Sequence, residues 1–202
     1  MLAGFAAFLA RTRSTTDVVL SLPVSARTTA ALRRSAGVIS NVVPLRVRLD
    51  LSAPGTDLIR DVQVEMNGAL RHQRYSYADM LADLRALGRE HTETRNAFGP
   101  VVNIMNFHRP IVYGDVPADY HVQSTGPVDD LSMNVYAGIP GKTLRVDFEA
   151  NPNLYTQDYL DFLHRRFLDF LLHFVSDPSA PVGDLPFATA DELAGFTPSR
   201  GN

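Results

Sequence analysis

Residues 156–175 carry the strongest helical pattern of the chain. Large apolar side chains recur in this segment every three or four residues, which places them on one helix face: Leu160, Leu163, Phe167, Phe170, Leu171 and Phe174. We expect Arg165, Arg166 and Asp169 to face water. Because so wide an apolar face must pack against other elements, the chain is expected to fold in layers around a core.

Strand-like runs fill much of the remaining chain. Residues 17–23 predict a buried strand, and the second half of residues 37–50 alternates between apolar and polar side chains as a strand does. Further strands are expected at 101–107, 120–125, 131–138 and 143–150. A hairpin turn is expected between the last two. With the helices, this order predicts an α+β or layered α/β sandwich, with a mixed, largely antiparallel sheet flanked by helices.

Shorter helices are expected before the later strands: over 1–13, over 28–37, from Thr56 and after Ser76. Thr28 or Thr29 is expected to cap the helix over 28–37, and Thr56 and Ser76 have the side chains of N-caps for the two later helices. Gly37 and Gly88 are the expected stops. The polar segment 89–100 is expected to form a loop.

Composition excludes several classes of function. The chain has 202 residues, 45% of them hydrophobic, which is enough for a sizeable core in one large or two small domains. Its net charge of −3 gives no field suited to nucleic acid or to an anionic membrane. The absence of cysteine excludes disulfides and thiolate chemistry and fits a cytoplasmic protein. The apolar run at residues 1–10 is too short to span a bilayer, which takes roughly 20 residues, so it is expected to be a buried helix.

No motif for self-sufficient chemistry is present. The sequence lacks the Gly-rich loops that bind phosphate, the hydrolase motif G-x-S-x-G and the zinc motif H-E-x-x-H. None of its six histidines lies at metal-ligand spacing from another. His164 and His173 are expected to be partly exposed helix residues. Asp129 and Asp130 are expected to stabilise a turn rather than to hold a metal or transfer protons. A globular body without its own active site is therefore predicted.

Residues 17–50 resemble the C-terminal half of a condensation domain of the nonribosomal peptide synthetases. That family carries Gly-x-Phe-Val-Asn-Thr and then an Arg four residues on, and Gly37, Asn41 and Arg46 match it. Three positions depart from it: Ile39, Ser40 and Val42.

Later segments extend the resemblance over nearly the whole chain. Residues 72–77, HQRYSY, partly match the family motif His-Gln-Asp-Tyr-Pro-Phe-Glu, and residues 95–96 stand where the family has Arg-Asn-Pro. Residues 124–135, STGPVDDLSMNV, and the tail 178–196, PSAPVGDLPFATADELAGF, are similar to condensation domains of siderophore synthetases.

The resemblance implies one lobe of the chloramphenicol acetyltransferase-like fold, in which two similar lobes form a V around an active-site tunnel. Residues 1–176 would be the C-terminal lobe and residues 177–202 an extended tail or linker toward a following adenylation domain. The family's catalytic motif, His-His-x-x-x-Asp-Gly, belongs to the N-terminal lobe, and this sequence contains neither His-His nor Asp-Gly. The chain alone is therefore expected to be inactive, being either part of a longer polypeptide or a lobe encoded apart from its partner.

The resemblance also places the strand with Asn41 beside the tunnel. Asn41, with Ser40 next to it, offers two donors and an acceptor to a thioester, a pantetheine amide or an acceptor amine; alternatively it bonds a neighbouring loop. Pro44 suits a strand at a sheet edge, where its missing N–H needs no partner. Arg46 is expected either to pair with a carboxylate across the lobe interface or to be a surface strand residue.

Residues 108–119 form a proline-containing crossover. The resemblance implies that this segment reaches the partner lobe and helps to close the tunnel, with His108, Arg109 and Tyr113 as its candidate residues. An ordinary surface loop is the alternative.

Three functions stay open. The first is the non-catalytic half of a condensation domain, which forms amide bonds between carrier-bound acyl and aminoacyl thioesters and supplies the tunnel wall and the carrier-docking surface. The second is a docking module that recruits a carrier protein without chemistry. The third is a diverged stand-alone acyltransferase whose base is one of its own histidines, with His108, beside the crossover, as the first candidate.

Under the first reading, the expected partners are the N-terminal lobe, peptidyl carrier proteins and a downstream adenylation domain, with no nucleic acid and no membrane. No metal and no directly bound cofactor are expected, because the substrates are carried on the phosphopantetheine of the carrier proteins.

Overall fold

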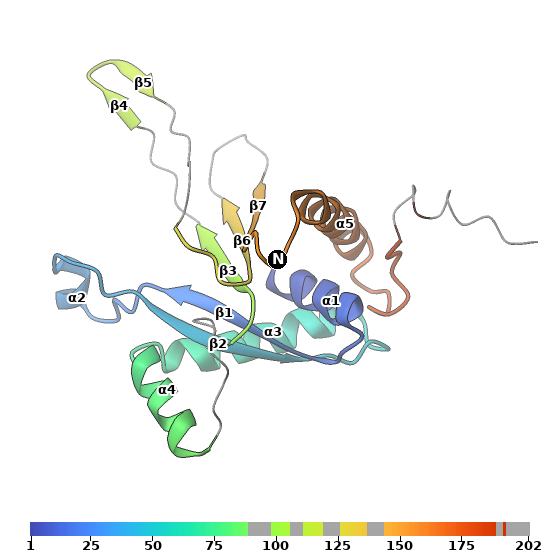
Figure 1. Ribbon diagram of the computed structural model, residues 1–202, viewed down its shortest axis with the longest axis horizontal. Coiled ribbons are helices and arrows are strands. Elements are labelled where there is room, and N and C mark those ends of the chain that lie inside the picture. Colours follow the sequence, from blue (N-terminus) through green and yellow to red (C-terminus); the bar gives the residue numbers. More distant parts are fainter. Residues whose placement is uncertain (89–97, 106–110, 119–125, 137–143, 189–191, 193–202) are drawn as a thin grey trace, which may run out of the picture. The chain divides into compact units, whose positions relative to one another are not determined.

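The computed structural model describes residues 1–88, 98–105, 111–118, 126–136, 144–188 and 192 (Figure 1). The chain divides into two compact units. Unit 1 consists of residues 1–20, 45–72 and 157–202, and unit 2 of residues 21–44 and 73–156. No helix in the described part of the chain is long and apolar enough to cross a membrane.

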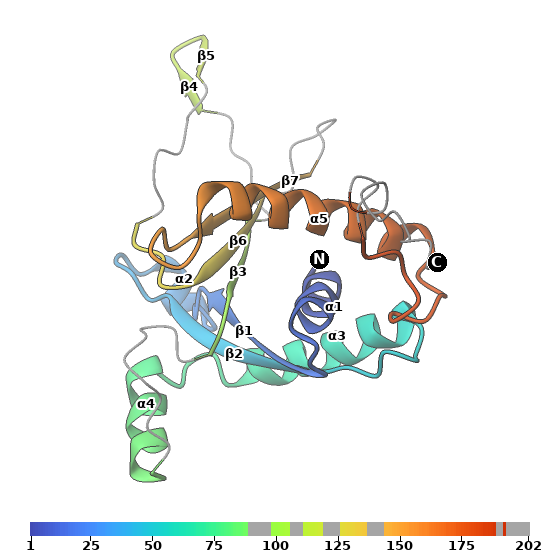
Figure 2. The same ribbon diagram turned by 45° about the vertical axis from the view of Figure 1, so that its right-hand side comes forward.

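The described residues of unit 1 include the helices α1 (Leu2–Arg13), α3 (Gly55–Arg71) and α5 (Gln157–Ser176). Helix α1 packs against both α3 and α5, and Figure 2 shows α1 and α5 side by side. Every residue from Ala3 to Ala10 is buried. The small residues of α1 allow close approach, since a Cβ added at Gly4 would lie 2.9 Å from Cδ1 of Leu171. The expected buried helix at the start of the chain is thus confirmed.

Aromatic side chains fill the core of unit 1. Four residues of the predicted apolar face of α5 are buried: Leu163, Phe167, Phe170 and Phe174. The other two, Leu160 and Leu171, are half-buried. The ring of Phe167 meets the rings of Phe5 and Phe8 edge-on, with centroids 5.4 and 5.3 Å apart. These contacts join α5 to α1 and account for the shared burial of both helices.

The segment after α5 is also part of unit 1. The backbone N–H groups of Gly55 and Thr56 donate to the carbonyls of Ala180 and Pro178, at 3.2 and 2.8 Å. The first turn of α3 therefore finds its hydrogen-bond partners in the tail, where Val182 is fully buried. Whether the lobe ends at residue 176, with a linker after it, remains a prediction.

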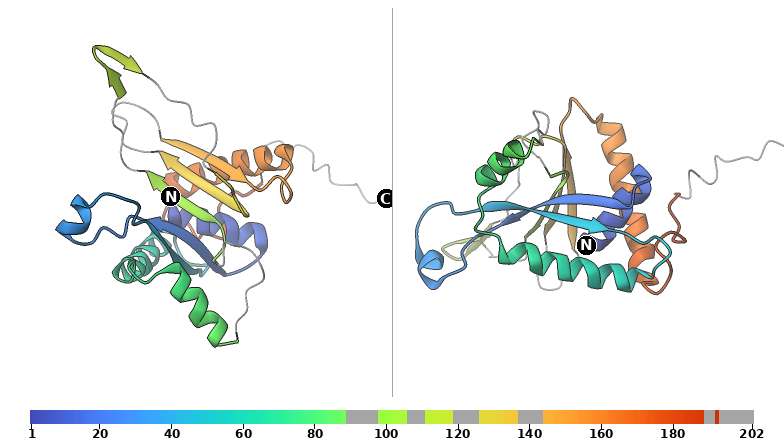
Figure 3. Two further views of the ribbon diagram at one scale, coloured as in Figure 1. Left: turned by 60° about the vertical axis from the view of Figure 1, so that its left-hand side comes forward. Right: turned by 90° about the horizontal axis from the view of Figure 1, so that it is seen from below.

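Unit 2 contains three neighbouring strands: β3 (Val101–Met105), β6 (Leu131–Tyr136) and β7 (Arg145–Ala150), drawn side by side in Figure 3. Strands β3 and β6 are parallel, and β6 and β7 are antiparallel. Two short helices, α2 (Ala30–Arg34) and α4 (Tyr77–Ala86), belong to the same unit.

Strands β1 (Asp17–Val24) and β2 (Asn41–Arg48) each have residues in both units. The strand order in the five-stranded sheet is β2-β1-β3-β6-β7, so β2 is an edge strand. Its position explains how Pro44 is accommodated, because an edge strand leaves one row of N–H groups unpaired. The buried faces of β1 and β2 carry Leu20, Leu22, Val43, Leu45 and Val47.

A separate two-stranded sheet, β4 (Ile111–Tyr113) and β5 (Val116–Ala118), lies within the predicted crossover. The two strands are antiparallel, and Gly114 adopts φ +62° in the turn between them. A crossover or a surface loop was expected at 108–119, without strands. Three-residue strands are too short to show a clear alternation, so this hairpin was missed.

The mixed sheet flanked by helices is confirmed, but three details differ from expectation. The sheet is less antiparallel than predicted, because β1 with β3 and β3 with β6 pair in parallel. Helix α2 ends at Arg34, short of Gly37. Thr56 lies inside α3, whose N-cap is Pro54 and has no side-chain hydrogen bond. The expected caps of α2 and α4 are confirmed, because the side chains of Thr29 and Ser76 accept hydrogen bonds at those helix starts. The expected features at 89–97, 120–125 and 139–142 lie outside the described residues.

Candidate functional site

Asn41 begins strand β2 and holds the segment that leads into α4. Its Nδ2 donates to the carbonyls of Gln73 and Tyr75, at 3.0 and 2.7 Å, and its Oδ1 accepts from the N–H of Tyr77 at 3.2 Å. Both amide hydrogens are therefore used within the chain. This geometry matches the alternative in which Asn41 bonds a neighbouring loop, and its contact with a ligand remains a prediction.

Replacing Asn41 with alanine is expected to lower the free energy of unfolding by about 1–2 kcal/mol, because three hydrogen bonds to partly exposed backbone groups are lost. Urea denaturation measures this change, and hydrogen exchange at the Tyr77 amide reports the local loosening. The exposed neighbour provides the matched control, since Ser40→Ala is expected to change stability by less than about 0.5 kcal/mol. Equal stability of the two variants would show that Asn41 does not anchor this segment.

Arg46 pairs with a carboxylate of its own chain. Its Nε lies 2.9 Å from Oδ1 of Asp17, and its Nη2 lies 2.5 Å from Oδ2. The hydrogen bond from Arg46 holds the pKa of Asp17 below its ordinary value, and the same bond raises the pKa of Arg46. Because the two side chains are 57% and 41% exposed, water and salt screen the pair, and it adds little to stability. Arg46 is thus placed as a surface strand residue, and pairing across an interface remains a prediction.

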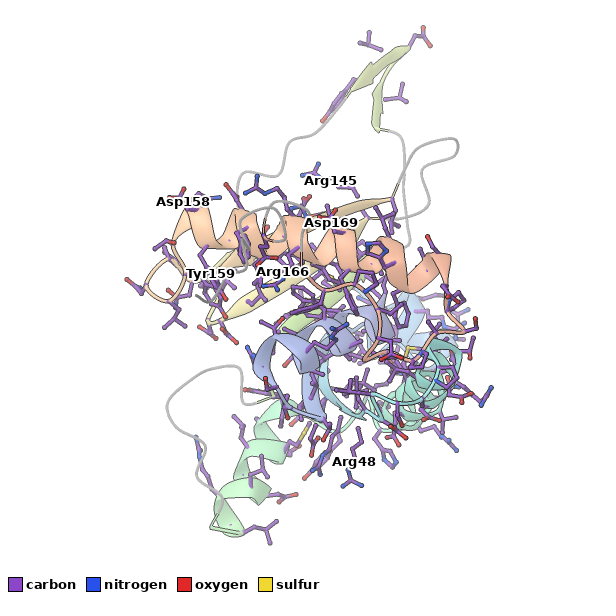
Figure 4. All side chains as sticks on the ribbon, turned by 90° about the vertical axis from the view of Figure 1, so that its right-hand side faces the viewer. Arg48, Arg145, Asp158, Tyr159, Arg166 and Asp169 are labelled. Atoms are coloured by element: carbon purple, nitrogen blue, oxygen red, sulfur yellow. The ribbon has the colours of Figure 1, made fainter. Side chains whose placement is uncertain are left out.

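A groove of about 410 Å³ adjoins Arg46 in unit 1. It lies between β2 and α3 and is lined by Arg46, Val47, Arg48, Asp61, Val62, Val64 and Glu65. Arg48 is labelled in Figure 4. The lining contains two arginines and two carboxylates, so its formal net charge is zero. None of its side chains is a histidine, serine or cysteine, so the lining lacks the imidazole, hydroxyl and thiol groups that acyl transfer commonly uses.

The remaining predicted site residues are spread over the chain. Ser40 is exposed before β2, and Pro44 is half-buried within it. On β4, the side chain of Tyr113 is 75% exposed, and the hairpin also exposes Val112 and Val116. His108 and Arg109 lie outside the described residues. The structure therefore does not bring the candidates together into one pocket among the residues that it describes.

Asp129 and Asp130 lie in a bend before β6, and the turn chemistry expected of their carboxylates remains a prediction. The carboxylate of Asp130 accepts from the hydroxyl of Tyr155 at 2.7 Å, and Asn151 donates to the backbone carbonyls of both residues. His164 is half-buried and His173 exposed on α5, as predicted. The described part of the chain contains no group of three acidic or histidine side chains that could hold a metal ion.

One polar residue in unit 2 was not singled out from the sequence. Asn134, in the middle of β6, is only 3% exposed, and its Nδ2 has no hydrogen-bond partner among the described groups. Its alternation with Met133 and Val135 was visible as a strand pattern. The burial of both faces of β6, which makes the residue unusual, depends on tertiary structure and is not visible in the pattern.

The condensation-domain family matches residues 1–194 of this chain. Among curated relatives, the isonitrile lipopeptide synthase of Streptomyces coeruleorubidus is 36% identical over 92% of this chain, which covers 12% of that protein. Enterobactin synthase component F of Escherichia coli is 28% identical over 96% of the chain, which covers 14% of it. The expected similarity to siderophore synthetases is thereby confirmed. The chain spans about one seventh or less of these two relatives.

Solved structures agree with the family match. The first condensation domain of the CDA synthetase has a TM-score of 0.80 and 35% identity, over 93% of this chain and 41% of the other. A starter condensation domain of the rhizomide synthetase RzmA, crystallised with C8-CoA, has a TM-score of 0.83 and 35% identity, over 94% of this chain and 43% of the other. In both cases nearly the whole chain matches less than half of a condensation-domain structure. By sequence and by fold, the chain belongs to the condensation-domain family.

Proposed function

We propose that this chain is the C-terminal lobe of a condensation domain in cytoplasmic nonribosomal peptide synthesis, where it forms one wall of the tunnel in which a partner lobe joins carrier-bound substrates. The observation that carries the proposal is the coverage: 93% of the chain matches only 41% of a solved condensation domain. In agreement with this, the sequence lacks both His-His and Asp-Gly, parts of the motif that the N-terminal lobe carries in this family.

The proposed reaction divides between the two lobes. The nitrogen of an aminoacyl group on one carrier attacks the thioester carbon of an acyl group on another. The C–N bond of the amide forms, the C–S bond breaks, and the amine proton passes to the leaving thiolate through a histidine of the partner lobe. No step requires a group that this chain would have to supply as nucleophile.

The contribution of this chain is to orient the carrier-bound substrates and to enclose them in the tunnel. Substrates arrive on the phosphopantetheine of peptidyl carrier proteins, so no separate cofactor is needed. Ser40, Asn41, Pro44 and Arg46 are the proposed tunnel and lobe-interface residues. Asn41 acts there through the loop that its hydrogen bonds fix.

The crossover is the segment proposed to reach the partner lobe. It includes His108, Arg109 and the exposed hairpin with Tyr113. Three large apolar side chains exposed on so small a hairpin support a role in contact with another surface: Val112, Tyr113 and Val116. The tail, residues 177–202, is proposed to lead toward an adenylation domain.

The test combines this chain with an N-terminal lobe that carries His-His-x-x-x-Asp-Gly, an acyl-loaded donor carrier and an aminoacyl-loaded acceptor carrier. Mass spectrometry is expected to detect amide product at least about a hundredfold faster with both lobes than with either alone. The matched control replaces the second histidine of the partner lobe with alanine and is expected to abolish this gain.

Other outcomes select the alternatives. Product formed by this chain alone would overturn the proposal in favour of a diverged acyltransferase, for which His108→Ala provides the check. Binding of loaded carriers without any product from the two lobes together would instead indicate a docking module.

A further inference from the structure

Polar side chains form a row across the three strands of unit 2. The register pairs Asn103 of β3 with Asn134 of β6, and Asn134 with Asp147 of β7. Paired residues of neighbouring strands point to the same face of a sheet, so these three side chains lie beside one another. The opposite face is apolar, with Val102, Met133 and Val135 all buried.

Asn134 occupies the centre of this row, where the burial of its side chain costs folding free energy. The residue is 3% exposed, and its Nδ2 has no hydrogen-bond acceptor among the described groups. A buried NH₂ group that donates no hydrogen bond loses its contact with water without compensation, so such groups are rare and call for an explanation. A nonpolar side chain of similar size would fit this strand at lower cost.

The carboxylate nearest in register is already engaged. Oδ1 of Asp147 accepts from Nε of Arg145 at 2.8 Å, and Oδ2 lies 2.6 Å from Nη2 of the same residue. Arg145, at the start of β7 and labelled in Figure 4, also lies over the ring of Tyr136 at 5.3 Å. Both oxygens of Asp147 are thus held toward Arg145, and its negative charge disfavours an anionic ligand beside Asn134.

We infer that Asn134 is a binding residue, and that its amide donates a hydrogen bond to a neutral carbonyl oxygen of the acyl-pantetheine chain of a carrier-bound substrate. This inference rests on the proposed function. The carboxamide is uncharged and offers donors, which matches a thioester or amide carbonyl rather than the phosphate of the arm. Its χ2 torsion is soft, so the donor can turn toward the half-buried Asn103, where a ligand would lie along the row.

The kinetic test uses Asn134→Leu in the two-lobe protein. We expect the KM for the acyl carrier to rise about tenfold, the equivalent of one lost hydrogen bond, while kcat stays within about twofold. The melting temperature is expected to stay the same or to rise, because the buried amide is gone. Ser132→Ala, on the same face of the same strand, is the matched control and is expected to change neither constant by more than about twofold.

An unchanged KM would overturn the inference in either of two ways. With an unchanged or higher melting temperature, a KM within twofold of the wild type would remove Asn134 from the binding site. With a lower melting temperature, it would show that the amide is satisfied within the row and is purely structural. In both cases the wild-type pair would still form product, so the proposed function would be unaffected.

A binding measurement covers the case in which the leucine variant does not fold or the lobe pair is inactive. The probes are S-acetyl-pantetheine and free pantetheine, added to the ¹⁵N-labelled wild-type chain. A shift of the Asn134 side-chain NH₂ signals with S-acetyl-pantetheine alone identifies the thioester carbonyl, and a shift with both probes identifies a pantetheine amide. Unmoved signals with both probes would overturn the inference, whereas a shift without product from the lobe pair would count against the proposed function alone.

Discussion

Replacing Phe167 with alanine is expected to lower the free energy of unfolding by about 3–5 kcal/mol. The Phe167 side chain is 0% exposed, and its ring meets those of Phe5 and Phe8 edge-on at 5.4 and 5.3 Å. Alanine removes the buried ring, both aromatic contacts and the packing between α1 and α5, and it leaves a cavity that a helix pair refills poorly. Urea denaturation, followed by circular dichroism, measures the loss.

The matched control for this substitution lies on the same helix. Leu172 is 63% exposed, so Leu172→Ala is expected to change stability by no more than about 0.5 kcal/mol. The contrast separates the burial of the side chain from any change in helix propensity, because both variants introduce alanine into α5. A loss below about 1.5 kcal/mol for Phe167→Ala would mean that α1 and α5 repack, and that the aromatic cluster does not hold unit 1 together.

The sequence predicts well those elements whose signals are local. The stripe that includes Leu163, Phe167 and Phe170 predicts α5 and its buried face, because a helix period repeated over five turns leaves little ambiguity. Thr29 and Ser76 likewise show helix starts, because their side chains accept from backbone N–H groups three residues on.

Errors occur where a distant partner replaces a local signal. Thr56 has the side chain of an N-cap, but the first N–H groups of α3 are satisfied by carbonyls of Pro178 and Ala180, more than a hundred residues later. Arg166 was expected to face water and is instead only 21% exposed, on the side of α5 where Phe187 packs. In both cases the tail supplies a partner that helical periodicity cannot reveal.

The candidate site shows the same division. The family motif located Asn41 and Arg46, but it could not show that their polar atoms bond to the backbone of residues 73–77 and to Asp17. Those partners lie 29 or more residues away in the sequence. Asn134 was missed because its local pattern is misleading. A polar residue that alternates with apolar ones is typical of a half-exposed strand, but β6 is buried on both faces.

Replacing Phe187 with alanine is expected to cost about 3 kcal/mol and to release the tail from unit 1. The guanidinium carbons of Arg11 and Arg166 lie 4.7 and 4.3 Å from the centroid of the Phe187 ring, and the ring also contacts those of Phe8 and Phe170. Removing the ring leaves two like charges close together, and burial followed by the charge of Arg166 already lowers the pKa of Arg11. Calorimetry measures the stability, and hydrogen exchange at the Val182 and Gly183 amides, which donate to Ala53 and Leu51, reports the tail.

The matched control for the tail is Phe187→Leu, which keeps most of the apolar volume but removes the face of the ring from both cations. We expect this variant to lose about 1 kcal/mol and to retain slow exchange at Val182, so that the two substitutions separate apolar packing from the cation–π contacts. Arg11 gives the contacts a second anchor, since its Nη1 donates to the carbonyl of Val182 at 3.3 Å and also to that of Leu185. If Phe187→Leu loses no stability, the two arginines contribute nothing through the ring, and if alanine and leucine lose the same amount, the apolar volume contributes nothing. If neither variant speeds exchange at Val182, the backbone hydrogen bonds to α3 hold residues 177–188 in place without Phe187.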